Sequence, residues 1–323
     1  MSHIPLPALR ADNPIAFLAA LGTLRILDGI RPAWTARLRW FNNGGWIPEL
    51  SVTGDSSLTE ISTALAAKLK NRATAIEFNW ADVIAVPTEL FHAKADAARE
   101  AATVYQRETV DFFAAFAADG ATSNSGDMKP TALCMTSGQM KFLKELRVIT
   151  AILALIPKSE DVSLVERFRA ALAEPWNYAD AQHSLGWDPT NEPVHALGAY
   201  DPSGQGKQTS VRSLVYLAAE AISLFPVFAC SGRLRTTGFH RDEHRQSWFQ
   251  WPIWEPELSV RSVRSLLQLG EIAHPTGREA ELRSRGICAI YRSRRHEFGK
   301  GYGIFRPAQL VMVQAACPDQ PPM

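Results

Sequence analysis

The sequence has few cysteines and no long hydrophobic run. Its four cysteines, Cys134, Cys230, Cys288 and Cys317, lie far apart, and no two have the Cys-x-x-Cys spacing of a zinc ribbon or a redox site. No apolar stretch reaches the roughly 18 to 20 uncharged residues that a membrane span needs. The N-terminus also lacks the basic and then apolar segments of a secretory signal. We therefore expect reduced cysteines, no membrane partner and a cytoplasmic protein.

The common catalytic motifs are absent too. There is no Gly-x-Gly-x-x-Gly, no Gly-Lys-Ser/Thr phosphate loop, no His-Glu-x-x-His and no Gly-x-Ser-x-Gly. The nearest candidate for a metal or acid-base site is the segment FHRDEH at 239–244, in which a helix would place His240 and His244 on one face. A third ligand is not evident, and a polar loop is the competing interpretation. We predict no catalytic residue, no metal and no cofactor.

The composition is that of an ordered globular protein, because 46% of the 323 residues are hydrophobic and 21% are charged. A chain of this length forms one large domain with a subdomain, or two domains. A stretch rich in Pro, Gly, Asp and Asn interrupts the periodic segments at 176–210. We predict an N-terminal α+β domain at 1–175, an irregular connection at 176–210 and a C-terminal α+β basic region at 211–323.

Hydrophobic periodicity predicts an α+β fold that opens with a helix and an antiparallel hairpin. The helix at 14–29 has Asp12 or Asn13 as its N-cap and Pro14 in its first turn, and Gly22 indicates a close helix crossing or a bend. The hairpin at 36–52 turns at an Asn-Asn-Gly-Gly sequence. The helical middle is predicted at 57–71, 91–118, 138–156 and 163–172, with an extended segment at 75–80.

The C-terminal part is predicted to mix strands with helices. Apolar periodicity places helices at 211–224 and 258–269, and strands at 227–230, 233–237, 247–251 and 286–292. The tryptophan-rich segment that begins at Ser247 is interpreted as a packed strand and corner, with a base-stacking platform as the alternative.

Positive charge is concentrated in the last third of the chain. The net charge is +1 overall, yet residues 231–323 contain 14 Lys and Arg against 9 Asp and Glu, a net charge of +5. Between Arg278 and Arg306, eight basic residues are interleaved with four aromatic ones. Basic side chains bind phosphates and aromatic rings stack on unpaired bases. This pattern favours contact with a nucleic acid over a merely solvated surface.

Three loops add candidates for nucleic-acid contact. The loops at 121–131 and 203–209 are small, polar and contain a lysine, and the Ser-Gly-Gln segment at 137–139 precedes a predicted helix whose N-terminus attracts anions. Gln139, Gln205 and Gln208 are possible readers of base edges. The full set of predicted nucleic-acid-binding residues is Lys129, Ser137, Gln139, Lys141, Lys207, Arg233, Arg235, Arg292, Arg294, Arg295 and Lys300.

Three segments in order resemble one known family. They are NPIAFLAALGTLRILDGI at 13–30, HSLGWDPTNEPVHALGAYDPS at 183–203 and WFQWPIWEPELSVRSVRSLL at 248–267. The chain resembles the large-subunit-like proteins of type I-G CRISPR systems, formerly I-U, as a short member of that family.

The resemblance implies a non-catalytic subunit of a crRNA-guided, Cascade-type surveillance complex in antiviral defence. Such a subunit lies near the 5′ end of the guide, contacts the protospacer-adjacent motif (PAM) of the target DNA and aids strand opening, while base pairing reads the sequence. Its implied partners are the crRNA, the target double-stranded DNA, the backbone and guide-end subunits, and a recruited helicase-nuclease.

Two other functions remain open at the sequence level. One is a metal-dependent nuclease or RNA-processing enzyme of the same defence system, using His240, Asp242, Glu243 and His244. The other is a scaffold that binds only proteins, with the tryptophan-rich segment as its interface.

Overall fold

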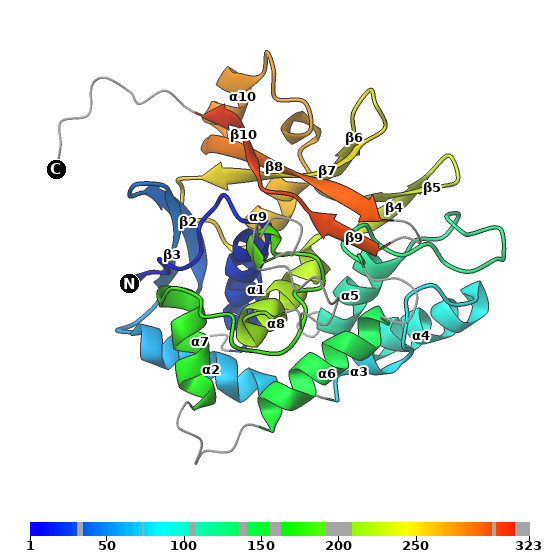
Figure 1. Cartoon of the computed structure of the whole chain (residues 1–323), viewed down its shortest axis with the longest axis horizontal. Helices are drawn as coiled ribbons and strands as arrows, with labels where there is room; N and C mark the ends of the chain where they lie inside the picture. Colours follow the sequence, from blue (N-terminus) through cyan, green and yellow to red (C-terminus); the bar gives the residue numbers. More distant parts are fainter. Residues whose placement is uncertain are drawn as a thin grey trace, which may run out of the picture.

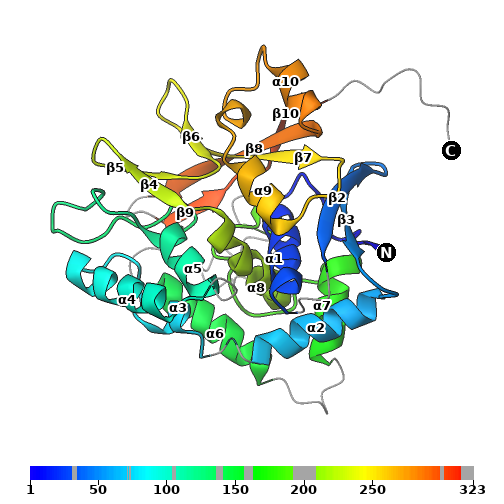
Figure 2. The same cartoon turned by 180° about the vertical axis from the view of Figure 1, so that it is seen from behind.

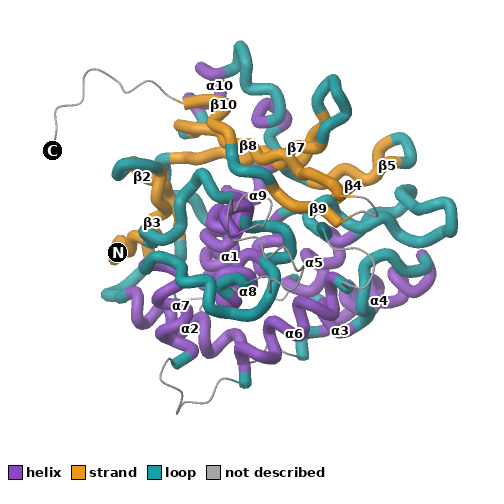
Figure 3. The backbone as a smooth tube through the Cα atoms, in the orientation of Figure 1, coloured by secondary structure: helices purple, strands orange, loops and turns teal. Residues whose placement is uncertain are grey.

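A computed structural model gives the fold of residues 1–30, 35–70, 72, 74–103, 107–135, 141–155, 163–191, 209–298 and 302–313. The fold is α+β, as the sequence predicts, with an N-terminal helix and antiparallel strands, helices in the middle, and strands and helices in the C-terminal part (Figure 1). Most helices lie on one side of the largest sheet, α10 (Glu279–Ser284) lies beside its strands, and the central helices lie between that sheet and the outer helices (Figure 3).

Helix α1 (Pro14–Ile30) is the centre of the molecule, with every residue from Pro14 to Leu24 buried. It begins where the side chain of Asn13 accepts a hydrogen bond from the amide of Ile15 at 3.1 Å, with Pro14 in the first turn. A Cβ on Gly22 would lie 1.7 Å from the carbonyl oxygen of Leu217 in α8 (Arg212–Glu220). The predicted close helix crossing at Gly22 is therefore confirmed.

The first sheet contains the predicted hairpin. β2 (Arg37–Asn42) pairs antiparallel with β3 (Trp46–Val52), and the turn between them uses Gly44 and Gly45 at positive φ. A strand that the sequence did not predict, β1 (Ser2–Pro5), adds to the other edge of β3.

A five-stranded antiparallel sheet is built by the C-terminal part. Its order is β10 (Gln309–Val313), β8 (Ile287–Phe298), β7 (Ser247–Trp254) and β6 (Phe239–Arg241), and β9 (Tyr302–Phe305) also pairs with β8. The tryptophan-rich strand β7 is core, as predicted: Trp251 and Trp254 are fully buried, with ring centroids 5.7 and 6.4 Å from that of Phe17. A separate hairpin joins β4 (Val227–Cys230) and β5 (Arg233–Thr236).

The other helices include several that pack around α1 and α8, and α10, which lies beside the large sheet (Figure 1). They are α2 (Leu58–Lys70), α3 (Ile76–Asn79), α4 (Thr88–Ala101), α5 (Glu108–Phe116), α6 (Phe142–Ala154), α7 (Leu164–Ala173), α9 (Val260–Leu267) and α10 (Glu279–Ser284), with 3₁₀ turns η1 (Pro189–Asn191), η2 (Ala221–Leu224) and η3 (Gly270–Ile272).

Three sequence predictions about elements were wrong. The helix predicted at 91–118 is two helices, because the chain is extended at Ala102 (φ −75°, ψ 137°) where no Gly or Pro marks the break. The segment predicted as extended at 75–80 contains the short helix α3. β8 continues to Phe298, six residues beyond the predicted end, because its pairing with β7 and β9 continues where the apolar pattern stops. The sequence analysis also missed β6, β9 and β10.

The described residues share one hydrophobic core that runs from Ile4 to Met312. Elements from both predicted domains contribute to it, since α1 crosses α8 and packs under β7. The boundaries at 175 and 210 stay a prediction. Among the described residues, no helix has the length and apolarity to cross a membrane.

Candidate nucleic-acid interface

Several of the predicted basic residues line one hollow of about 520 Å³. It lies between the β4–β5 hairpin, the end of the 121–131 loop, the strands β6 and β7, and β8. The loop, the β4–β5 hairpin and the hairpin formed by β6 and β7 project from the same side of the molecule in both views (Figures 1 and 2). None of the described residues that line it is an Asp or a Glu. We call this hollow the cationic groove, and its charged lining residues are Lys129, Arg233, Arg235, Arg241 and Arg295.

A tight turn and two anchors position the hairpin beside the groove. The turn between β4 and β5 consists of Ser231 and Gly232, both at positive φ (50° and 69°), as a two-residue hairpin turn with right-handed strand twist requires. The Nζ atom of Lys129 donates to the carbonyl of Gly232 at 3.2 Å, which ties the 121–131 loop to the tip. At its base, the hydroxyl of Thr236 accepts from the amide of Ala132 at 2.9 Å.

The groove contains cations that the protein itself does not neutralise. Arg233, Arg235 and Arg241 are exposed, and no carboxylate in the described ranges lies within ion-pair distance of them. Arg295 pairs with Glu297 at 2.6 Å, yet its Nε atom is buried and has no hydrogen-bond partner among the described residues. A concentration of cations without carboxylates raises the local positive potential. The groove is therefore suited to an anion, and its several separate cations suit a polyanion.

The three β8 arginines that the sequence grouped lie on two faces of the sheet. Successive residues of a strand point to opposite faces. Arg295 points into the groove, whereas Arg292 and Arg294 lie on the other face. There the guanidinium of Arg292 stacks 4.3 Å from the ring centroid of Trp248 and donates to Gln309 at 3.2 Å. A single phosphate-binding row of all three is thus not formed.

Other predicted candidates lie elsewhere. Lys141 is the N-cap residue of α6 and pairs with Asp82 at 2.8 Å, and it does not line the groove. The carboxylate of Asp82 has a lowered pKa because it accepts hydrogen bonds from Lys141 and Arg147. Four candidates fall outside the described residues, as do two of the proposed base readers: Ser137, Gln139, Lys207, Lys300, Gln205 and Gln208.

Several arginines of the basic third are used in internal ion pairs. Arg264 pairs with Asp111 at 2.7 Å. Arg285 pairs with Glu281 at 2.7 Å and with Glu271 at 3.5 Å, and Arg278 approaches the same two carboxylates. The positive charge of the last third is therefore not spread evenly. Some of its arginines are neutralised by internal ion pairs, whereas most arginines of the groove have no such partner in the described ranges.

The histidine segment does not form the helix on which its metal-site hypothesis depended. His240 lies in β6, and His244 lies in the turn to β7. Asp242 is used by the turn itself, since it accepts from the indole of Trp248 at 3.0 Å. Burial lowers the pKa of His240 to about 4, and the neighbouring His274 and Arg292 act in the same direction. In the part of the chain that the structure describes, no group of three His, Cys, Asp or Glu side chains is placed to hold a metal.

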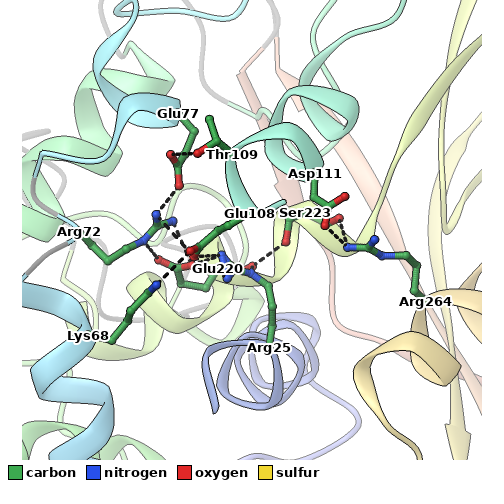
Figure 4. Close-up of polar contacts among 10 residues, drawn as sticks. All are labelled: Arg25, Lys68, Arg72, Glu77, Glu108, Thr109, Asp111, Glu220, Ser223 and Arg264. Atoms are coloured by element: carbon green, nitrogen blue, oxygen red, sulfur yellow. Dashed lines mark hydrogen bonds and ion pairs between the residues drawn. The ribbon is translucent and has the colours of Figure 1, made fainter. Parts of the chain in front are cut away.

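A second charged cluster is buried between helices (Figure 4). Glu220 is fully buried and accepts from Arg25 at 2.7 Å and from Arg72 at 2.8 Å. Glu108 accepts from Arg25 at 2.6 Å and from Lys68 at 2.9 Å. The cluster, which we call the buried ion-pair network, consists of Arg25, Lys68, Arg72, Glu77, Glu108 and Glu220.

The buried ion-pair network is balanced, with three cations and three carboxylates. Burial alone would raise the pKa of Glu108, but the charges of Arg25, Arg72 and Lys68 outweigh it and hold that pKa at about 2. The neighbouring cavity of about 1230 Å³ is lined by Asp and Glu as well as by Arg. Sequence reasoning missed this network because its members are scattered from residue 25 to residue 220. The network is neutral, in contrast to the cationic groove.

The three segments that carry the family resemblance meet in the core. The amide of Asn13 donates to Asp188 and to Thr190, both at 3.1 Å, and thereby joins the first segment to the second. Phe17 stacks on Trp251, which joins the first segment to the third. None of the residues that line the cationic groove belongs to these segments. They therefore support the fold, and the groove is a separate feature.

Comparisons of the chain with protein-family models, with curated proteins and with solved structures find no match.

Proposed function

We propose that this chain is a non-catalytic subunit of a crRNA-guided, Cascade-type surveillance complex, and that its cationic groove binds the sugar-phosphate backbone of the guide or of the target DNA. The observation that carries the nucleic-acid part is the groove itself: Arg233, Arg235 and Arg241 face it without carboxylate partners in the described ranges. The resemblance of the three core segments supports the CRISPR setting and a place near the guide 5′ end and the PAM.

Backbone contact is the chemistry that such a groove performs best. Each phosphate that an Arg or Lys neutralises releases condensed counterions, so affinity falls as salt rises. Arg also donates two parallel hydrogen bonds to one phosphate. These contacts read no sequence, which fits a complex in which base pairing of the guide supplies the discrimination and a protein subunit holds the backbone while the strands open.

The test of the CRISPR assignment is copurification. The full chain, expressed with the products of its neighbouring genes, should be recovered with backbone and guide-end subunits and with a bound RNA of guide character, identified by sequencing. A helicase-nuclease should join only after target binding. Recovery as an isolated protein, or in an assembly without RNA that survives nuclease treatment, would instead support the protein-only scaffold.

The test of the groove is the salt dependence of DNA binding by the assembled complex. Removing two phosphate contacts with R233A/R235A should reduce the slope of log affinity against log salt by about 1.4 on single strands or 1.8 on duplex. The matched control is R278A/R285A, which removes the same charge from residues that pair with Glu271 and Glu281. If both double variants change the slope equally, the groove is not the binding surface.

A nuclease is tested in the same preparation. Intact labelled RNA and DNA after incubation with Mg²⁺ or Mn²⁺ would eliminate the enzyme alternative. Cleavage that is lost in H240A would replace the present proposal.

A further inference from the structure

Phe228 is an exposed aromatic side chain, with 56% of its surface accessible. It lies in β4, on the hairpin that borders the cationic groove. The large aromatic rings of Trp248, Trp251, Trp254 and Phe249, by contrast, are buried. An exposed phenyl ring beside cations is suited to a ligand that offers both an apolar face and negative charge.

The register of the hairpin places Phe228 and two groove arginines on one face. Phe228 is opposite Arg235, and Cys230 is opposite Arg233. Cross-strand partners share a face, and so do residues two apart in a strand. The other face of the hairpin packs on the protein, where Thr236 contacts Ala132. The phenyl ring and both guanidinium groups therefore form one solvent-facing surface.

The charge of this surface selects its ligand. Two arginines without carboxylate partners in the described ranges favour a polyanion, and a phenyl ring beside them matches the π-face of a nucleobase. Inside a duplex both faces of each base are covered by its neighbours, so a ring on the protein surface can stack only on an unpaired base or on a strand end. The surface thus fits a single strand better than an intact duplex.

We infer that Phe228 stacks on an unpaired nucleobase of a single strand whose phosphates lie on Arg233 and Arg235. This inference rests on the proposed function and specifies the form of nucleic acid that the groove receives. It assigns to the β4–β5 hairpin the capture of a displaced or frayed strand.

The experiment compares the full chain and its F228A, F228L and F228W variants. Fluorescence anisotropy measures binding to a labelled single-stranded oligonucleotide and to a duplex of the same sequence. F228A and F228L should weaken single-strand binding about 5- to 150-fold, the range for one base stacked on one ring, and F228W should retain it. Duplex binding should change less than about twofold. The matched control is L310A, at an apolar side chain of similar exposure (51%) on β10.

The possible outcomes separate the inference from the proposed function. A wild-type chain that binds neither oligonucleotide overturns the proposed function. A wild-type chain that binds with a salt slope sensitive to R233A/R235A, while F228A or F228L binds the single strand normally, overturns only the stacking. Loss of an acidic protein partner in F228A, with unchanged nucleic-acid binding, would assign the surface to that partner instead. Equal melting temperatures of the variants exclude unfolding as the cause.

Discussion

Replacing Glu220 with Gln should cost about 3 to 5 kcal/mol of the free energy of unfolding, the range for removing one partner of a buried ion pair. Glu220 is fully buried, and its two oxygens accept from Arg25 and Arg72. Gln has nearly the same volume, so the substitution creates no cavity. It removes one of three carboxylates and leaves a net charge of +1 in the buried ion-pair network. Since domains are stable by about 5 to 15 kcal/mol, the loss is large.

The assay is urea unfolding of the full chain, followed by circular dichroism. The control E281Q removes an exposed carboxylate that pairs with Arg285, and it should change stability by at most about 0.5 kcal/mol. The double variant R25M/E220Q restores neutrality, so it should be more stable than the sum of the two single changes indicates, by at least about 1 kcal/mol. A loss below about 1 kcal/mol in E220Q would refute the argument that charge balance holds these helices together.

Three further outcomes follow from the core. G22A should destabilise the chain by several kcal/mol, because its Cβ would meet the carbonyl of Leu217. The control G29A has open space around the new Cβ and should be neutral or stabilising by up to about 1 kcal/mol, and thermal melting compares the two variants. N13A should cost about 1 to 2 kcal/mol in urea unfolding through loss of the α1 cap, and equal stability would contradict that role. Because the pKa of Glu108 is lower in the folded chain than in the unfolded one, where it is about 4.5, its ionised carboxylate stabilises the fold at higher pH. This stabilisation is lost as the pH falls from about 4.5 toward about 2. In E108Q the melting temperature should therefore fall less over this pH range.

Local signals were sufficient for the elements whose ends are marked in the chain. Helix α1 has a cap and a proline at its start, and the β2–β3 hairpin has glycines at its turn. The break between α4 and α5 has no such mark, and β6 is only three residues long, so neither produced a periodic signal. The predicted end of β8, at Arg292, was too early. The sequence shows where apolar residues stop, but it does not show that strand pairing continues beyond them.

Most charged residues of the candidate site could be predicted from the sequence, but their arrangement in one groove could not. Lys129, Arg233, Arg235 and Arg295 were named from charge and loop composition, and the structure brings these four together. Arg241 was not named, although it lines the same groove. Neither was Phe228, because one phenylalanine in an apolar strand looks like core until its exposure is known.

The sequence by itself determined the α+β class, the buried first helix, the tryptophan-rich core strand and the excess of positive charge in the last third. These are properties of composition and of neighbours along the chain. Only the tertiary structure decided which charges remain free, because neutralisation depends on partners far apart in sequence: Arg264 finds Asp111, Arg25 finds Glu220, and Arg233 and Arg235 find no carboxylate in the described ranges. Strand alternation then separated Arg295 from Arg292 and Arg294, which no count of charge reveals.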